Sequence, residues 1–201
     1  MKLLLKSLVV FLGLAAASPA LAFSYSCSDW KEPLLKDDFW KEATPATIAD
    51  CVQDMGFVMG FSVKDRDDFG LTPLHWAALF SRNPEVITAL LEAGADINAR
   101  NDKQGETPLH SAAIGNDNPD VITALLQSGA DVNARNASGA TPLHWAAFRN
   151  SNPDVITALL EGGADGSIED DNGRTPFDLA KDNEALKNTD AYWALNDARF
   201  K

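Results

Sequence analysis

The sequence predicts an all-α repeat solenoid, in which each unit is a helix–turn–helix followed by a β-hairpin-like finger. A seven-residue motif beginning Thr-Pro-Leu-His occurs at residues 72–78, 107–113 and 141–147, and a degenerate copy occurs at 175–180. The threonines that begin the four copies are 35, 34 and 34 residues apart. A period in the range of about 20–50 residues indicates units that stack on one another. One unit cannot bury its own apolar face, but neighbouring units bury these faces against each other.

Residues 1–22 have the features of a secretory signal peptide. Lys2 and Lys6 make the start basic, residues 8–17 form a short apolar run, and residues 20–22 read Ala-Leu-Ala, a small-x-small cleavage pattern. The apolar run is shorter than the roughly 20 residues that a transmembrane helix needs. We therefore predict cleavage at the end of this segment, export of the chain, and no membrane insertion of the mature protein.

Residues 23–63 are predicted to form an N-terminal cap that is a diverged first repeat. Thr44 and Pro45 repeat the Thr-Pro helix start of the later units. Cys27 and Cys51 are the two cysteines of the chain, and an isolated pair in an exported protein usually forms a disulfide. Closing a loop of about 25 residues would stabilise the fold by about 3–3.5 kcal/mol in the chain-entropy model.

Residues 64–181 are predicted to hold the repeats, and each motif begins a first helix of about two turns. Threonine is a good N-cap, and proline suits the first helical position because it has no N–H that would be left unbonded there. In the first complete copy, this helix is expected to begin at Pro73 and to end near Ser81.

A second recurring segment predicts the second helix of each unit. Residues 83–91 read Asn-Pro-Glu-Val-Ile-Thr-Ala-Leu-Leu, and close copies occur at 118–126 and 152–160. The acid lies near the positive end of the helix dipole, and the valine, isoleucine and leucines form one apolar stripe. Gly94 predicts the left-handed turn that ends the helix, and the polar segment 96–105 predicts a finger.

The end of the chain is predicted to close the stack. After the degenerate fourth copy, Leu186 and the Tyr-Trp-Ala-Leu run at 192–195 supply apolar residues. Terminal units of a solenoid need a surface that ends the stacking. We therefore predict that residues 182–201 form a C-terminal capping helix.

This organisation resembles the ankyrin-repeat family, which has the same Thr-Pro-Leu-His-x-Ala-Ala motif at a period near 33 residues. The resemblance covers most of residues 44–181 and implies an ankyrin-repeat solenoid with a capping unit at each end. The turn between the two helices is one residue longer than the common form, and the second finger is also longer by one. With the signal peptide and the cysteine pair, the chain is similar to small exported ankyrin proteins of Gram-negative bacteria, which implies a periplasmic or secreted location.

The histidines are the obvious candidates for catalysis or metal binding, and both readings are disfavoured. His75, His110 and His144 occupy one position in three successive repeats. Stacked helices lie about 8–10 Å apart, whereas a zinc ion holds nitrogens at about 2.0–2.1 Å. The family resemblance implies that these side chains form hydrogen bonds within and between repeats. Without a Gly-x-Ser-x-Gly or a phosphate-binding glycine loop, we predict no enzyme activity, cofactor or metal site.

Protein binding is the function that remains. The resemblance implies a binding surface formed by the finger tips and the exposed face of each first helix. The partner-binding residues predicted on this basis are Phe69, Lys103 and Gln104 on the fingers, and Trp76, Leu79, Phe80, Ile114, Trp145, Phe148 and Arg149 on the helices. Apolar residues exposed together on one face indicate an interface. For the two tryptophans, we favour packing between adjacent first helices, inside the scaffold, and partner contact is the alternative.

The charge of the chain narrows the class of partner. The formal net charge of −12 becomes −14 when residues 1–22 are removed, because that segment holds two lysines and no acidic residue. Such a surface repels nucleic acid and anionic membranes. We favour the interpretation that the charge keeps the protein soluble, and a partner with a basic patch is the alternative. We predict a monomer that acts as a scaffold or adaptor for a periplasmic or extracellular protein. The alternative is a neutralising inhibitor, or immunity protein, of a secreted or periplasmic enzyme.

Overall fold

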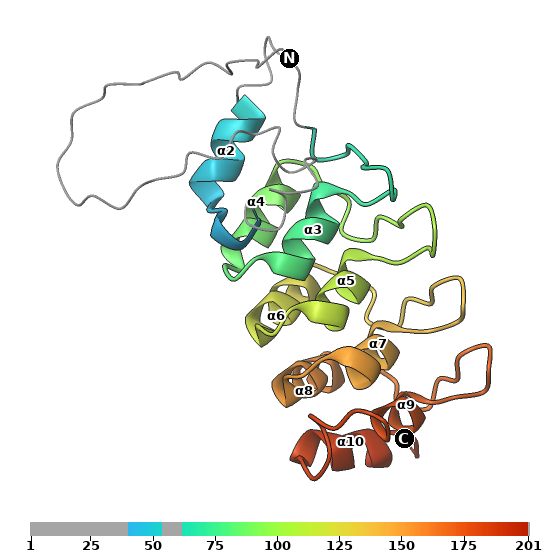
Figure 1. Ribbon diagram of the computed structural model, residues 1–201. Helices are drawn as coiled ribbons and strands as arrows, with labels where there is room; N and C mark the ends of the chain where they lie inside the picture. The colour runs from blue at the N-terminus through green and yellow to red at the C-terminus, as the bar shows by residue number, and fades with distance from the viewer. Residues whose placement is uncertain (1–39, 54–61, 201) are drawn as a thin grey trace, which may run out of the picture.

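The computed structural model describes residues 40–53 and 62–200, which form a stack of helix pairs (Figure 1). The first helices of the repeats form one row, which holds α3 (Pro73–Phe80), α5 (Pro108–Gly115), α7 (Pro142–Arg149) and α9 (Pro176–Ala180). The second helices form the other row, which holds α2 (Pro45–Gln53), α4 (Glu85–Glu92), α6 (Pro119–Gln127), α8 (Pro153–Glu161) and α10 (Asp190–Ala198). Each helix contacts the next helix of its own row. Since the described residues contain helices and no strand, the predicted all-α solenoid is confirmed.

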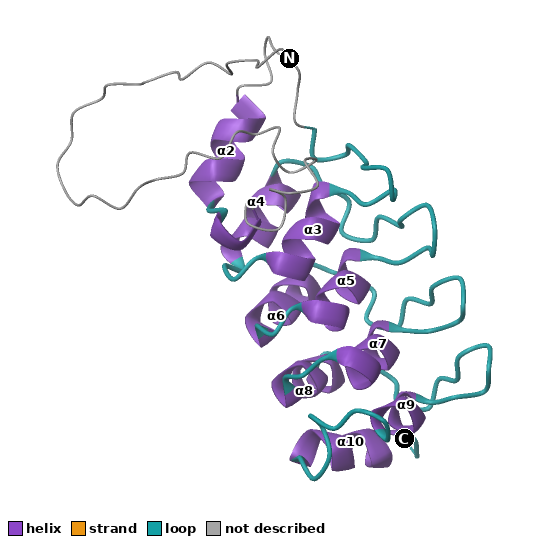
Figure 2. Cartoon of the chain, viewed as in Figure 1, coloured by secondary structure: helices purple, strands orange, loops and turns teal. Residues whose placement is uncertain are grey.

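Four loops project from the same side of the stack, where Figure 2 shows them in teal. They are finger 1 (residues 64–71), finger 2 (96–106), finger 3 (131–140) and finger 4 (165–174). Each finger turns back on itself through a main-chain hydrogen bond near its tip. Neighbouring fingers are also joined: Ala137 N–H donates to the Gln104 carbonyl at 2.7 Å, and Asp171 N–H donates to the Ser138 carbonyl at 3.0 Å. The fingers therefore form a connected surface.

Each first helix begins as the motif predicts. Thr72 is extended, with φ −88° and ψ 165°, and Pro73 is the first helical residue of α3. The helix ends at Phe80, and Ser81 then donates its N–H to the Ala77 carbonyl at 2.8 Å. This end lies one residue before Ser81, so the predicted end near Ser81 is confirmed.

The second helices also follow the sequence pattern, with one difference. In α6, Asn118 Oδ1 accepts the Asp120 N–H at 3.0 Å, and the helix begins at the proline. In α4, the helix begins one residue after the proline, at Glu85, although Asn83 Oδ1 still accepts the Glu85 N–H at 3.0 Å. Gly94 has a φ of 93°, which confirms the predicted left-handed turn at the end of α4.

The apolar stripe of the second helices lies in the core. Val86, Ile87 and Leu90 of α4 have no exposed surface, and the equivalent residues of α6 and α8 are equally buried. Burying a side chain of this size stabilises a fold by about 1.5–3 kcal/mol. These residues form one cluster with apolar residues of both rows, so the core continues from each repeat into the next.

The two ends of the stack differ. At the N-terminal end, α2 contacts α4 in the second row, and Trp40 and Ile48 are buried in the core. At the C-terminal end, α10 contacts both α8 and α9, and it buries Leu195. None of the described helices combines the length and the apolar character that crossing a membrane requires.

Three predictions for the N-terminal region lie outside what the structure describes. Residues 1–22, the predicted signal peptide, precede the described residues, and so does Cys27. Cys51 falls in α2, but its side chain is not among those described. The signal peptide, its cleavage and the Cys27–Cys51 disulfide therefore stay predictions.

Candidate functional site

The three histidines connect each repeat to the next. We number the repeats from the one that begins at Thr72, so that the four Thr-Pro motifs begin repeats one to four. In the first repeat, His75 Nδ1 accepts the Thr72 N–H at 3.1 Å, and its Nε2 lies 3.0 Å from the Glu106 carbonyl on finger 2. His110 and His144 repeat both contacts. A main-chain amide donates to Nδ1, so the proton lies on Nε2, which donates to the carbonyl. Each ring is therefore a neutral tautomer with both nitrogens used by the scaffold.

Burial keeps these histidines neutral. It lowers the pKa of His75 and of His110 to about 4, and it also lowers the pKa of His144. Among residues 40–53 and 62–200, no three His, Cys, Asp or Glu side chains are grouped so that they could hold a metal ion. With both nitrogens already bonded, the histidines offer neither a metal ligand nor a catalytic base.

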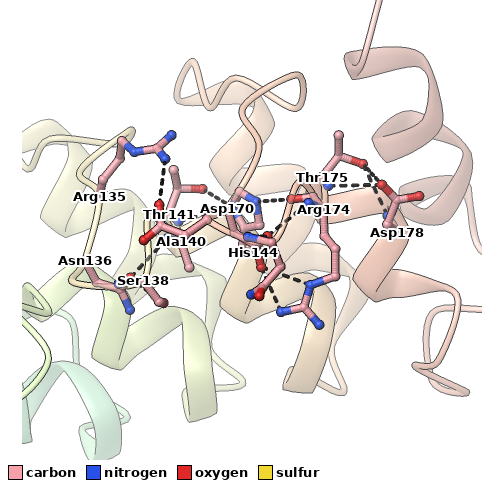
Figure 3. A network of polar contacts seen from close by, with 12 residues as sticks. Arg135, Asn136, Ser138, Ala140, Thr141, His144, Asp170, Arg174, Thr175 and Asp178 are labelled. Atoms are coloured by element: carbon pink, nitrogen blue, oxygen red, sulfur yellow. Dashed lines mark hydrogen bonds and ion pairs between the residues drawn. The ribbon is translucent and has the colours of Figure 1, made fainter.

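In the fourth repeat, an aspartate takes the place of the histidine (Figure 3). Asp178 Oδ2 accepts the Thr175 N–H at 3.0 Å and the Thr175 hydroxyl at 2.8 Å. The hydrogen bond from Lys181, together with those from Thr175, lowers the pKa of Asp178 to about 2. The carboxylate caps its own helix as histidine does, but it has no N–H to donate to a following finger. This substitution suits the last repeat of a stack.

An asparagine ladder also holds the repeats together, and the sequence reasoning missed it. Asn116 Nδ2 donates to the carbonyls of Ala78 and Ser81 in the preceding repeat, at 2.8 and 2.9 Å. Asn150 and Asn183 make the same pair of contacts one and two repeats later. The signal was present, since these asparagines recur at 34 and 33 residues, just after each first helix.

The face that remains for a partner is formed by the fingers and the first helices, and it contains two grooves. The first groove, of about 340 Å³, lies between fingers 1 and 2 and above α3 and α5. Its lining is Phe69, Leu71, Trp76, Leu79, Asn101, Lys103, Gln104, Glu106, Ser111 and Ile114. It brings together six of the ten residues that the sequence predicted for partner binding.

Within the first groove, the predicted residues have different roles. Phe69 is 48% exposed, and Lys103 Nζ lies 4.1 Å from the centre of its ring. Trp76 is only 7% exposed, and its Nε1 donates to Asp67 Oδ2 at 2.9 Å. Phe80 stacks on Trp76 with ring centres 5.7 Å apart. Phe69 and Lys103 thus form an exposed rim, whereas Trp76 packs into the scaffold beneath it.

The second groove is smaller, about 110 Å³, and lies between fingers 3 and 4. Its lining is Ser138, Ala140, His144, Trp145, Phe148, Asp170, Arg174 and Leu179. Phe148 is 47% exposed and lies 6.3 Å from the partly buried Trp145, measured between ring centres. Two predicted residues line neither groove: Phe80 is partly buried against Trp76, and Arg149 is exposed at the end of α7.

One wall of the second groove is a closed ion pair (Figure 3). Arg174 donates to Asp170 Oδ2 from Nη2 at 2.8 Å and from Nε at 3.0 Å. Burial raises the pKa of Asp170, but the hydrogen bonds from Arg174 and from Asn172 outweigh it and hold this pKa at about 2. The wall therefore carries a carboxylate and a guanidinium whose charges offset each other.

Comparison with known proteins identifies the repeats. A family model described as ankyrin repeats (3 copies) matches residues 48–136 and 116–195. An ankyrin repeat protein of fowlpox virus (strain NVSL) is 45% identical over 42 residues, which are 21% of this chain and 8% of the viral protein. The chain thus matches a small part of that curated relative's length.

Proposed function

The chain belongs to the ankyrin-repeat family, whose repeats serve as protein–protein interaction modules, and on that premise we propose that it is an exported, non-catalytic scaffold or adaptor. Its partner would be a protein of the periplasm or the extracellular space. The observation that carries the proposal is the face with two grooves, where Phe69 and Phe148 are each about half exposed, at 48% and 47%. Aromatic residues exposed beside grooves are the usual anchors of a protein interface.

Export is the part of the proposal that rests on the sequence. It is supported by the basic, then apolar, then small-x-small pattern of residues 1–22 and by the isolated pair Cys27 and Cys51. The net charge of −14 after cleavage supports a partner with a basic patch, because opposite charges speed the encounter of two proteins.

The proposal is tested by crosslinking the protein in its native compartment and identifying what is captured. The double variant Phe69→Glu with Phe148→Glu should fold normally and lose at least tenfold in capture. Trp193→Glu is the matched control, because Trp193 is 55% exposed but lies on α10, in the other row of helices. Equal capture by both variants would remove the grooved face from the interface.

The same experiment separates the adaptor from the inhibitor. If the captured partner is an enzyme that stays active in the complex, the adaptor is supported. If a stoichiometric complex abolishes that enzyme's activity, the chain is a neutralising inhibitor rather than an adaptor. Turnover of a substrate by the isolated chain, lost with a change in one groove residue, would contradict the non-catalytic proposal altogether.

A further inference from the structure

A third groove lies between α8 and α10, at the C-terminal end of the second row of helices (Figure 1). Its volume of about 800 Å³ is more than twice that of the first groove. Its lining is Thr157, Leu160, Glu161, Gly163, Ala164, Asp165, Gly166, Ala194, Asp197 and Ala198. None of these residues lines the first or the second groove, so the third groove is a separate surface.

The third groove opens where the contacts between repeats change. Leu126 at the end of α6 packs on the following repeat, since a Cβ at Gly162 would lie 2.4 Å from its Cδ1. Leu160 holds the equivalent position in α8, 34 residues later, and it lines the groove. The leucine that joins α6 to the next repeat thus forms part of an open surface on α8.

A glycine at the start of finger 4 lets α10 lie close to the main chain. Ile97 and Val132 occupy this position in fingers 2 and 3, and both pack against the core. Gly166 replaces them, and a Cβ there would lie 2.6 Å from the Cβ of Ala198. A valine in finger 4 would therefore displace α10. The shape of the groove is thus set by a residue that departs from the repeat.

The floor of the third groove is apolar. Leu160 and Ala164 are partly buried and pack against the core, whereas Ala194 of α10 is exposed. The volume of the groove lies within the range of about 300–1,000 Å³ that is typical of binding pockets. An apolar floor in a groove of this size suits apolar side chains of a partner.

Three carboxylates border this floor. Glu161, Asp165 and Asp197 line the groove, and no Lys, Arg or His is among the described residues that line it. None of the three forms an ion pair with a described residue. Hydrogen bonds from Ser167 lower the pKa of Asp165, so this group is ionised at neutral pH. The groove therefore combines an apolar floor with negative charge that the described residues leave unbalanced.

The same charge pattern extends along the second row. The helices α4, α6, α8 and α10 contain seven acidic residues and no Lys or Arg. In the first row, α3, α5 and α7 contain one arginine and no acidic residue. A positively charged segment would therefore be drawn to the second row, and the third groove adds apolar surface to that charge.

We propose that the third groove is a second interaction surface, which binds a cationic amphipathic segment of a partner protein. Apolar side chains of the segment would lie on Leu160 and Ala194, and Lys or Arg side chains beside them would reach the three carboxylates. Because Lys and Arg have long apolar stems, they can cover the edges of the floor while their charged ends stay at the rim. This surface goes beyond the function proposed above, which rests on the first two grooves.

Other occupants fit the groove less well. Among the described residues, no three His, Cys, Asp or Glu side chains are grouped to hold a metal ion, so the carboxylates match several separate charges rather than one cation. A second copy of the chain has the same net charge of −14 after cleavage, and two such copies repel each other. A basic segment of another protein satisfies both the charge and the apolar floor.

The surface can be tested with a short peptide in place of the partner. The ¹⁵N-labelled protein is titrated with acetyl-Lys-Leu-Leu-Lys-Lys-Leu-Leu-Lys-amide, while assigned main-chain N–H resonances are followed by NMR. We expect a saturable shift at Gly163, which lines the groove, at least fivefold larger than at Gly129, which holds the same position one repeat earlier. Equal shifts at the two glycines, or no saturable shift, would overturn the proposal.

Two matched peptides separate charge from apolar contact. Replacing every leucine by glycine, or every lysine by glutamate, should weaken binding at least tenfold. Equal binding of the glycine peptide would mean that charge acts alone. Equal binding of the glutamate peptide would mean that charge plays no part, and either result would reject the proposed mode of binding.

Variants of the protein test whether the groove itself binds the peptide. Glu161→Gln with Asp197→Asn should weaken binding of the lysine–leucine peptide at least tenfold. Glu85→Gln with Asp120→Asn is the matched control, because it changes the net charge equally on exposed residues of the same row that do not line the groove. Equal weakening by both pairs would show that the charge of the whole row attracts the peptide, and would overturn the proposal.

The two proposed surfaces can fail independently. Phe69→Glu with Phe148→Glu should leave peptide binding unchanged within about twofold, because neither residue lines the third groove. Loss of peptide binding in this variant would contradict a separate surface. Failure to capture any protein in the native compartment would instead count against the proposed function, because the peptide titration does not depend on it.

Discussion

The first and third repeats have the same seven-residue motif and use its tryptophan differently. Trp76 is 7% exposed and its indole N–H is bonded to Asp67, whereas Trp145 is partly exposed and its indole N–H has no acceptor among the described residues. The motif sets the helix, its cap and its core contacts in both repeats. The residue nine positions before the tryptophan, aspartate in one repeat and asparagine in the other, decides whether the indole N–H has an acceptor.

Acid should destabilise the stack, since buried neutral histidines join each repeat to the next. The folded-state pKa of about 4 for His75 and His110 lies below the ordinary value of 6.5. Their contribution to stability is therefore complete above about pH 6.5 and is lost as the pH falls toward 4. Between pH 7.5 and 4.5 we expect the free energy of unfolding to fall by about 2–3 kcal/mol for each, about 5 kcal/mol together, in urea titrations.

His110→Gln provides the control for this pH dependence. It should reduce the loss between pH 7.5 and 4.5 by about half, because one of the two strongly shifted groups is gone. Asp170 and Asp178, with pKa values of about 2, titrate below this range and do not interfere. An unchanged pH dependence in this variant would show that the histidines are not its source.

Truncating each tryptophan to alanine should destabilise the fold by different amounts in the first and third repeats. Trp76→Ala removes a buried ring, a stacking contact with Phe80 and a hydrogen bond, so the free energy of unfolding should fall by about 3–5 kcal/mol. Trp145→Ala removes a partly exposed ring whose N–H is unpaired, so the loss should be smaller by about 1–2 kcal/mol. Urea unfolding of both variants measures the difference. Equal losses would contradict the contrast between scaffold and surface.

Exchanging the residue types at positions 67 and 136 should reverse which of the two indole N–H groups has an acceptor. Asn136→Asp gives Trp145 an acceptor and should raise the free energy of unfolding by about 1 kcal/mol, whereas Asp67→Asn should lower it by about 1–3 kcal/mol. Thermal or urea unfolding of the two single variants checks the signs. Changes of the same sign would show that the pairing of the indole N–H does not govern stability in these repeats.

The smallest effect is expected at the tip of finger 1. Lys103→Met removes the cation above Phe69 but keeps a flexible apolar side chain. Because an exposed cation–π contact contributes only about 0.5–1 kcal/mol, the free energy of unfolding should fall by no more than that. A larger loss in urea unfolding would mean that the rim of the first groove is part of the scaffold rather than a surface for a partner.

Much of the fold could be read from the sequence because its causes are local. The Thr-Pro start of α3, the Asn cap of α6 and the positive φ of Gly94 each depend on the residue and its immediate neighbours. The repeat period then implied the stacking. The start of α4 at Glu85, rather than at the proline, is the kind of one-residue detail that local pattern alone does not resolve.

The candidate site was less predictable. Six of the predicted residues line the first groove and two line the second, because the repeat fixes which positions face the fingers. Packing of the tryptophans inside the scaffold, the interpretation favoured from the motif, describes Trp76, but the motif did not show that Trp145 is partly exposed. Asn136 was missed altogether, because nothing in a single finger shows that its amide lacks a partner.

The sequence by itself determined the repeat, the caps of its helices, the apolar stripe of the core and the histidine position, since each depends on residue type at a fixed spacing. The tertiary structure decided which tryptophan is bonded, which aromatic residues border a groove, and where two donors are left without an acceptor. These properties depend on atoms of different fingers and helices meeting in space. The repeated residues therefore explain how the chain folds, and the non-repeated residues that line the two grooves mark where we expect a partner to bind.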